Sequence, residues 1–167
     1  MPRVELRKVK IADKDYFARW WRDKELIRLT SGDFSVITDK EVEKYFGDIL
    51  KNKIDYHFMI TLGEKVIGHI SLVKRRGGWY ETQIVIGEEK YRGKGYGSEA
   101  IKLLIQKAKR LKISKIYLEV RPDNSRAIKA YERVGFRKVK VVSYPKNKSL
   151  PKTVRMELEE EDSKYSK

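Results

Sequence analysis

The chain has 167 residues, of which 40% are hydrophobic and 38% are charged, a length and balance that suit one globular domain with a real core. It contains no cysteine, which excludes a disulfide scaffold, cysteine-ligated zinc and thiol catalysis. No apolar run approaches the roughly 18 residues that span a bilayer, and the first residues carry no apolar signal region. We therefore expect no membrane association and a cytoplasmic location. The formal net charge of +15 leaves two interpretations open, a bound anion or polyanion and a lysine-rich solvated surface.

The first half of the chain predicts a strand, two helices and a meander. Residues 3–9 fit a strand, and apolar spacing from Asp13 fits a helix. A second helix opens with a capping box formed by Thr38 and Glu41. Polar and apolar residues then alternate in three successive segments separated by glycine turns, which predicts an antiparallel meander over residues 56–62, 66–73 and 81–87.

The second half predicts a long helix, a strand, a short helix and a closing hairpin. A helical apolar stripe runs through Ile101, Leu104, Ile105, Ala108 and Leu111. The later elements are a strand at 116–120, a helix at 125–134 that ends at Gly135, and strands at 136–144 and 153–158. The whole order predicts an α+β (mixed α/β) domain over residues 1–158, with a mostly antiparallel twisted sheet of about seven strands and helices on both faces. Residues 159–167 form a polar tail that we expect to fray.

A glycine-rich turn, Arg92-Gly93-Lys94-Gly95-Tyr96-Gly97, joins the last meander strand to the long helix. Glycines let backbone N–H groups approach an anion closely, and the helix N-terminus adds unpaired donors and partial positive charge. Arg92 and Lys94 add full charges, so the segment predicts a phosphate or pyrophosphate site. The spacing fits neither a P-loop nor a dinucleotide fingerprint, because Gly93-Lys94 is followed by Gly95 and the antiparallel strands before the turn exclude a βαβ unit.

Two motifs carry a resemblance to a known family. Arg92, Gly95 and Gly97 fill the pattern R/Q-x-x-G-x-G/A. About thirty residues later the pattern N-x-x-A-x-x-x-Y-x-x-x-G-F is filled by Asn124, Ala127, Tyr131, Gly135 and Phe136. Over roughly residues 3–158 the chain resembles the GNAT acyltransferase superfamily, and within it the branch of ribosomal-protein-alanine and spermidine-type acetyltransferases. The resemblance implies that the phosphate-bearing ligand is acetyl-coenzyme A (acetyl-CoA), which serves as a cosubstrate. It implies no metal.

The resemblance also implies a set of coenzyme-binding residues. Backbone groups of Ile84 and Ile86 are expected to pair with the pantetheine arm, and the Ile86 amide to polarise the acetyl carbonyl. Asn124 matches a residue near the pantetheine arm, and its alternative role is a helix N-cap. The pyrophosphate would be cradled by Arg92, Gly93, Lys94, Gly95, Tyr96, Gly97 and Ser98.

Two residues are implied in catalysis. Tyr131 matches the family tyrosine that donates a proton to the departing thiolate. Glu81 is the candidate base, at the family's strand glutamate, although Thr82 and Gln83 depart from the neighbouring pattern. Deprotonation through a water relay is the alternative.

The predicted function is acetyl transfer to a primary amine by direct attack in a ternary complex. The basic composition slightly favours a protein N-terminal amine over a polyamine or aminoglycoside, which would need an acidic pocket. Glu25, Asp33 and Glu41 could supply such a pocket, and that would reverse the preference. The basic loop at 145–152 could contact a ribosomal or otherwise acidic partner, and a homodimer is left open. A hypothesis of another class, a nucleic-acid-binding module, accounts for the charge and leaves both motifs unexplained.

Overall fold

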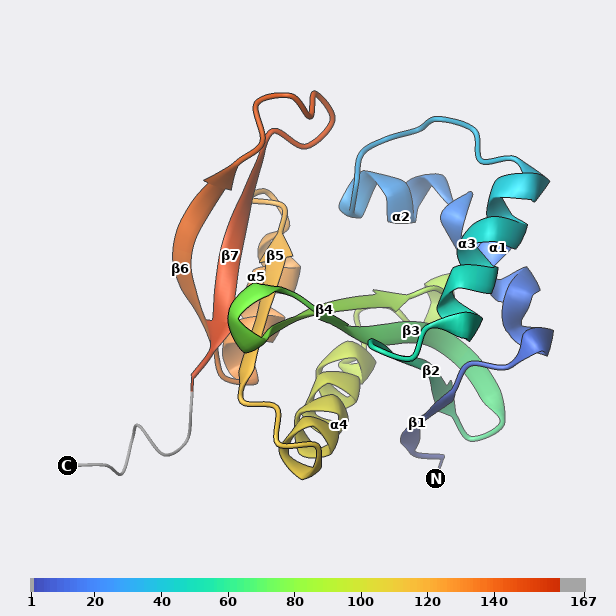
Figure 1. Ribbon diagram of the computed structural model, residues 1–167, viewed down its shortest axis with the longest axis horizontal. Helices are drawn as coiled ribbons and strands as arrows, with labels where there is room; N and C mark the ends of the chain where they lie inside the picture. The colour runs from blue at the N-terminus through green and yellow to red at the C-terminus, as the bar shows by residue number, and fades with distance from the viewer. Residues whose placement is uncertain (1, 160–167) are drawn as a thin grey trace.

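The computed structural model describes residues 2–159, and these form one seven-stranded sheet in the order β1-β2-β3-β4-β5-β7-β6 (Figure 1). Neighbouring strands are antiparallel except β4 and β5, which are parallel. The strands are β1 (Val4–Lys8), β2 (Tyr56–Leu62), β3 (Lys65–Lys74), β4 (Trp79–Ile86), β5 (Lys115–Val120), β6 (Phe136–Ser143) and β7 (Lys152–Leu158). This confirms the predicted fold class. The predicted tail at 159–167 lies outside the described residues except for Glu159.

Helices cover both faces of the sheet. They are α1 (Lys14–Trp21), α2 (Lys24–Leu29), α3 (Asp39–Lys51), α4 (Tyr96–Arg110) and α5 (Ser125–Arg133). The predicted capping box begins α3, because the Thr38 side chain accepts from the Glu41 amide at 3.1 Å and Glu41 accepts from the Thr38 amide. Helix α2 was absent from the sequence prediction. Its N-cap is Asp23, whose carboxylate accepts from the amides of Glu25 and Leu26.

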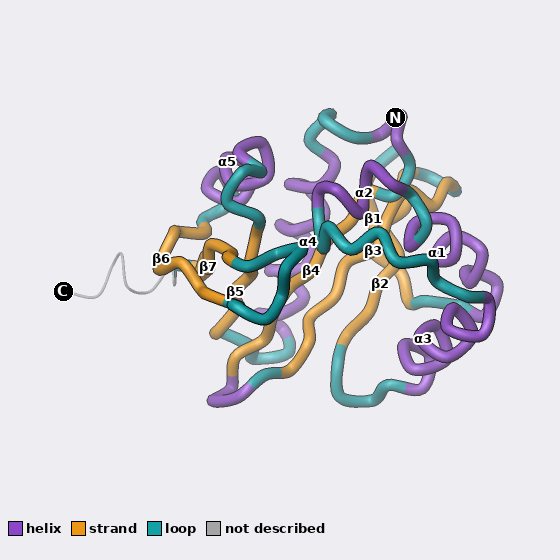
Figure 2. The backbone as a smooth tube through the Cα atoms, turned by 90° about the horizontal axis from the view of Figure 1, so that it is seen from above, coloured by secondary structure: helices purple, strands orange, loops and turns teal. Residues whose placement is uncertain are grey.

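Two apolar cores follow from this layering. The larger core packs α4 and α5 against one face of the sheet, with Ile101 and Leu104 of α4 and Ile70 of β3 fully buried. The smaller core packs α1, α2 and α3 on the other face of the β1–β4 half, around Phe17 and Phe46. Figure 2 shows α1 and α3 at one end of the molecule and α5 with β6 and β7 at the other. The two ends therefore meet where β4 lies beside β5.

The aromatic side chain of Trp20 fixes the end of β4. Trp20 is only 4% exposed, and a methyl group built on Gly87 would lie 2.1–2.3 Å from its indole ring. Position 87 therefore has no room for any side chain, and the chain can leave β4 here only through glycine. The close packing holds α1 against the strand that leads into the glycine-rich turn.

Candidate active site

The sheet opens between β4 and β5. Their parallel ladder pairs only Trp79–Glu81 with Lys115–Tyr117, and beyond this point the two strands separate. The Gly87 amide donates to the Ile67 carbonyl and the Arg75 amide to the Trp79 carbonyl, each at 2.8 Å, so odd-numbered residues of β4 bond to β3. Even-numbered residues point their backbone groups the other way. Ile84 and Ile86 therefore direct their amides into the opening, as their predicted role requires.

The glycine-rich turn lies at the end of this opening. Gly97 packs over β4, because a methyl group there would contact the Ile84 and Ile86 side chains at 3.8 Å. The first backbone bond of α4 runs from the Glu99 amide to the Gly95 carbonyl. The amides of residues 93–98 make no hydrogen bond to any residue between 2 and 159. Converging free donors at the start of a long helix form an anion site, so the backbone fits a pyrophosphate.

The backbone conformation of the turn explains its glycines. Gly93 has φ +72° and Gly95 has φ +86°, both in the left-handed region that L-residues avoid. Lys94 lies exposed between them. The rings of Tyr96 and Tyr91 pack edge-on, with 6.1 Å between their centroids. Ser98 ends the run of free amides.

Arg92 differs from its predicted role. Its Nε donates to the Ile86 carbonyl and its Nη2 to the Gly87 carbonyl, both at 2.8 Å, and Nη2 also lies 3.3 Å from Asp23 Oδ2. The Arg92 amide bonds to the Glu89 carbonyl. The sequence assigned this guanidinium to the phosphate. The structure instead uses it to hold the end of β4 and the start of α2, because these carbonyls and this carboxylate lie within its reach.

Asn124 and Tyr131 come from the unit that follows β5. The Asn124 side chain caps α5 by accepting from the Ala127 amide at 3.3 Å, so its capping role is present. Tyr131 is half-buried and packs edge-on against Phe136, with 6.2 Å between the ring centroids. Burial raises the pKa of Tyr131 to about 12, so the phenol keeps its proton at neutral pH. Its hydroxyl makes no hydrogen bond within residues 2–159.

Glu81 lies at the last position of β4 that pairs with β5, and its carboxylate is bound by Arg75. Its Oε1 accepts from Arg75 Nη2 at 2.7 Å and from Arg75 Nε at 3.0 Å, and its side chain is 12% exposed. These hydrogen bonds raise the pKa of Arg75 above its usual value. The Glu81 carboxylate is therefore already held by a cation in this structure.

A second carboxylate, Glu119 of β5, was missed by the sequence prediction. It accepts hydrogen bonds from the hydroxyls of Tyr144, at 2.6 Å, and Thr153. The bond from Tyr144 raises the pKa of that phenol to about 12. No cation within residues 2–159 forms an ion pair with Glu119. Strand alternation was the available signal, because it places Glu119 on the face opposite the buried Leu118 and Val120.

Glu81, Tyr117 and Glu119 share one face of the sheet, here called the acceptor face, on the side away from α4. Two loops border it. Arg121, just after β5, lies 3.4 Å from both the Thr30 carbonyl after α2 and the Ser149 carbonyl of the β6–β7 loop. Between these loops is a depression of about 890 Å³. It is lined by Asp33, Ser143, Tyr144, Pro145, Lys146, Asn147 and Lys148. The predicted basic loop therefore adjoins the acceptor face.

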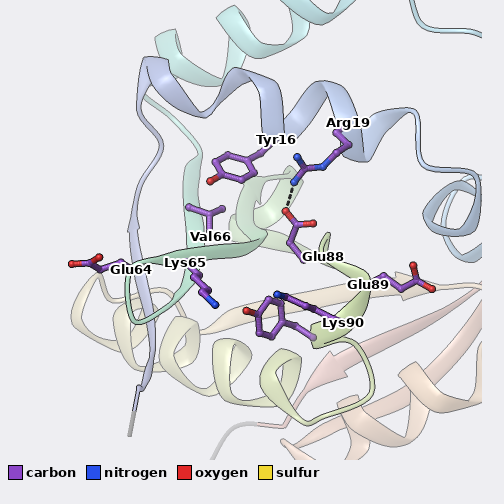
Figure 3. A pocket seen from close by; sticks show the side chains of 9 residues that line it. Tyr16, Arg19, Glu64, Lys65, Val66, Glu88, Glu89 and Lys90 are labelled. Carbon is purple, nitrogen blue, oxygen red and sulfur yellow. Dashed lines mark hydrogen bonds and ion pairs between the residues drawn. The ribbon is translucent and has the colours of Figure 1, made fainter.

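A depression of about 860 Å³ lies on the other side of the β4 end (Figure 3). Tyr16 and Arg19 of α1 form one wall, and Lys65, Glu88 and Lys90 lie opposite. Arg19 and Glu88 form an ion pair across it. Arg19 and Glu88 thus neutralise each other across this depression, and the free backbone donors at residues 93–98 are not part of its lining.

The described residues include neither a membrane-spanning helix nor a cluster of metal ligands. None of their helices is long and apolar enough to cross a membrane. Their histidine and acidic side chains nowhere gather in a group of three that could bind a metal ion.

Known proteins match this arrangement. The model of the acetyltransferase (GNAT) domain matches residues 3–137. The uncharacterized N-acetyltransferase p20 of Bacillus licheniformis is 26% identical over 145 residues, covering 81% of this chain and 80% of p20. For another curated relative the aligned region covers as little as 27% of that protein.

Solved structures share the fold. The aminoglycoside acetyltransferase AAC(6′)-Ib, in complex with ribostamycin and coenzyme A, superposes with a TM-score of 0.80 at 19% identity, over 98% of this chain and 97% of that one. The spermidine N-acetyltransferase of Vibrio cholerae, with CoA and spermine, gives a TM-score of 0.79 at 20% identity, over 93% and 94%. With an open β4–β5 pair, free amides at the glycine turn and a family model matching most of its length, this chain belongs to the GNAT family of acetyl-CoA-dependent N-acetyltransferases.

Proposed function

We propose that this protein acetylates the N-terminal amine of a peptide or protein by direct attack on acetyl-CoA in a ternary complex. The observation that carries the proposal is the charge pattern around the acceptor face. Among residues 2–159 no cation pairs with the Glu119 carboxylate, whereas Glu81 is paired with Arg75. The Glu119 carboxylate can bind the single ammonium group of such an acceptor.

Two neighbouring carboxylates support the same choice, whereas Asp33 in the lining of the depression forms no ion pair within residues 2–159. Asp23 is paired with Arg92, and Glu25 with Arg28 at 2.7 Å. A polyamine or aminoglycoside carries several cations, and each needs a negative partner to offset its desolvation. The β6–β7 loop instead presents Lys146 and Lys148 beside the face, which favours neutral or acidic residues after the acceptor amine.

The acceptor amine also needs modest help to lose its proton. An α-amino group has an ordinary pKa of about 7.7–8.0, against about 10.4 for a lysine-type amine. A substantial fraction is therefore neutral near pH 7.5. We assign Glu119, directly or through a water molecule, as the acceptor of the remaining proton, in place of Glu81.

The other steps follow from the positions of residues in the opening. Acetyl-CoA supplies an activated acetyl thioester when bound. The amides of residues 93–98 hold its pyrophosphate, and the Ile84 backbone pairs with the pantetheine arm. The Ile86 amide donates to the acetyl oxygen. As the amine nitrogen bonds to the acetyl carbon and the carbon–sulfur bond breaks, the Tyr131 hydroxyl donates its proton to the sulfur.

An acceptor screen tests the proposal. Peptides beginning with Ala or Ser, the same peptides blocked at the N-terminus, spermidine and kanamycin are each incubated with acetyl-CoA. Released thiol gives the rate, and mass spectrometry locates the acetyl group. We expect the free peptides to exceed the small amines by at least about tenfold in kcat/KM. Faster acetylation of spermidine or kanamycin would overturn the peptide assignment.

The fold neighbours favour the second candidate, acetylation of a polyamine or an aminoglycoside, because solved structures of similar fold contain spermine and ribostamycin. The nucleic-acid hypothesis is tested separately by titrating salt against binding of a random duplex. Dispersed lysines predict weak binding that disappears as salt rises. Tight duplex binding without CoA binding would overturn the enzymatic proposal.

A further inference from the structure

The guanidinium of Arg126 lies directly against the glycine-rich turn. Arg126 is in the first turn of α5, whereas the turn precedes α4, so the contact joins the two motif-bearing segments. A methyl group built on Gly93 would lie 3.2 Å from both terminal nitrogens of Arg126 and 3.3 Å from its Cζ. The guanidinium thus lies beside the first of the glycines that flank the free amides.

Arg126 has no protein partner within residues 2–159. It makes no hydrogen bond, ion pair or ring contact there, although other arginines near the site are engaged. Arg92 holds the end of β4, and Arg121 contacts Asp123 at 3.4 Å. Within the turn itself, Lys94 is an exposed cation. The full charge next to the free amides therefore comes from α5 as well as from the turn itself.

We propose that Arg126 is a phosphate-binding residue that closes the cradle over the pyrophosphate of acetyl-CoA from the α5 side. The inference rests on the proposed use of the turn amides. A guanidinium presents a planar fork of donors that matches two phosphate oxygens, and its charge offsets the diphosphate. Arg126 occupies an unspecified position of the Asn124-x-x-Ala127 pattern, so the family motif does not assign it.

The arrangement explains why Gly93 and Arg126 occur together. Any side chain at position 93 would press on the guanidinium at 3.2 Å and would also adopt the left-handed φ of +72°. The glycine therefore gives the turn its shape and gives the arginine its place. Arg92, which the motif highlights, holds the end of β4. Arg126 supplies the positive charge toward the phosphate that the motif assigns to Arg92.

The test compares Arg126→Gln with Arg133→Gln. Arg133 is exposed in the last turn of the same helix, so its replacement removes the same charge at the other end of α5. Calorimetry measures Kd for CoA, for dephospho-CoA, which lacks the 3′-phosphate, and for inorganic pyrophosphate as a competitor. Arg126→Gln is expected to weaken all three about tenfold, because it removes a charge-assisted bond. Arg133→Gln should change none more than about twofold.

Further outcomes separate the alternatives. Arg126→Lys keeps the charge and loses the fork, so we expect intermediate affinity. The Tm of Arg126→Gln without ligand should match wild type, because the side chain has no partner to lose. Unchanged affinity would overturn the proposal, and so would a loss confined to CoA, which would indicate a 3′-phosphate contact. Failure of the wild-type protein to bind CoA would overturn the proposed function itself.

Discussion

The Tyr131 hydroxyl keeps its proton at neutral pH, because burial raises its pKa to about 12. A group that stays protonated can only donate, which fits the departing thiolate and not the attacking amine. Tyr131→Phe should therefore lower kcat by about 100-fold while leaving the Kd for CoA nearly unchanged. Steady-state kinetics and calorimetry measure the two effects.

The matched control is Tyr56→Phe, which removes a hydroxyl from another partly buried tyrosine, on β2. It should leave kcat within about twofold of wild type. An unchanged rate in Tyr131→Phe would mean that water or another group protonates the thiolate.

The two acceptor-face carboxylates differ in their partners, and this predicts different effects of replacement. Glu119→Gln retains an oxygen for Tyr144 and Thr153 but can no longer take a proton, so kcat/KM should fall by about 10- to 100-fold. Glu81→Gln leaves Arg75 without its carboxylate, so its main effect should be on stability. Rates from pH 6 to 9 and denaturant unfolding separate the two. A larger loss of activity in Glu81→Gln would restore Glu81 as the base.

At the scale of elements, the turn and α4 act as one anion-binding unit. Gly95 is the N-cap of α4 at φ +86°, and a side chain built on it meets no protein atom within 4 Å. Gly95→Glu would combine a strained backbone with a negative charge beside the free amides. CoA binding should weaken by more than about 100-fold in calorimetry.

Gly47→Glu provides the control, because Gly47 lies within α3 and its substitution also meets open space. It adds the same side chain and charge away from the turn, and its Kd for CoA should equal that of wild type. Micromolar binding retained in Gly95→Glu would contradict the cradle.

Strand periodicity was the most informative signal in the sequence. It located the meander within two residues of β2, β3 and β4, because alternation with period two is strong over such lengths. Helix α2 has six residues, too few to show an apolar stripe. Its start depends on the Asp23 cap, which no flanking pattern emphasised.

Side-chain partners were beyond the reach of sequence patterns. The motif marked Arg92 as a phosphate-binding residue and gave no sign that its guanidinium bonds to the Ile86 carbonyl. Glu119 meets Tyr144 and Thr153, which are 25 and 34 residues away, through strand pairing and a loop. Such contacts depend on register and loop path, which local periodicity does not determine.

At the scale of the whole molecule, stability should depend on a histidine pair between the sheet and α1. His57 Nδ1 and His69 Nε2 lie 3.1 Å apart, and the Phe17 ring packs edge-on against His69 at 4.9 Å. Burial lowers the pKa of His69 to about 3 and also lowers that of His57, which Asp55 partly opposes. The folded protein therefore favours neutral rings.

The sign of the pH effect follows from this depression. An unfolded histidine has a pKa of about 6.5 and binds more protons than folded His69 between that value and about 3. Stability is therefore fully present above pH 6.5 and declines as the pH falls. The free energy of unfolding, measured with denaturant, should be about 2 kcal/mol lower at pH 5 than at pH 7. His69→Gln should make the free energy of unfolding less dependent on pH. A wild-type free energy of unfolding that does not change with pH would contradict the prediction.

The separation of β4 from β5 has a consequence for how the family is recognised. The groups that Ile84 and Ile86 present to the opening belong to the main chain, whereas their side chains pack against the start of α4. Any β-branched or aliphatic residue offers the same amide at the same spacing. Ligand recognition therefore does not restrict which residue occupies each position of the strand. It restricts residue identity only in the turn, where the backbone conformation requires glycine.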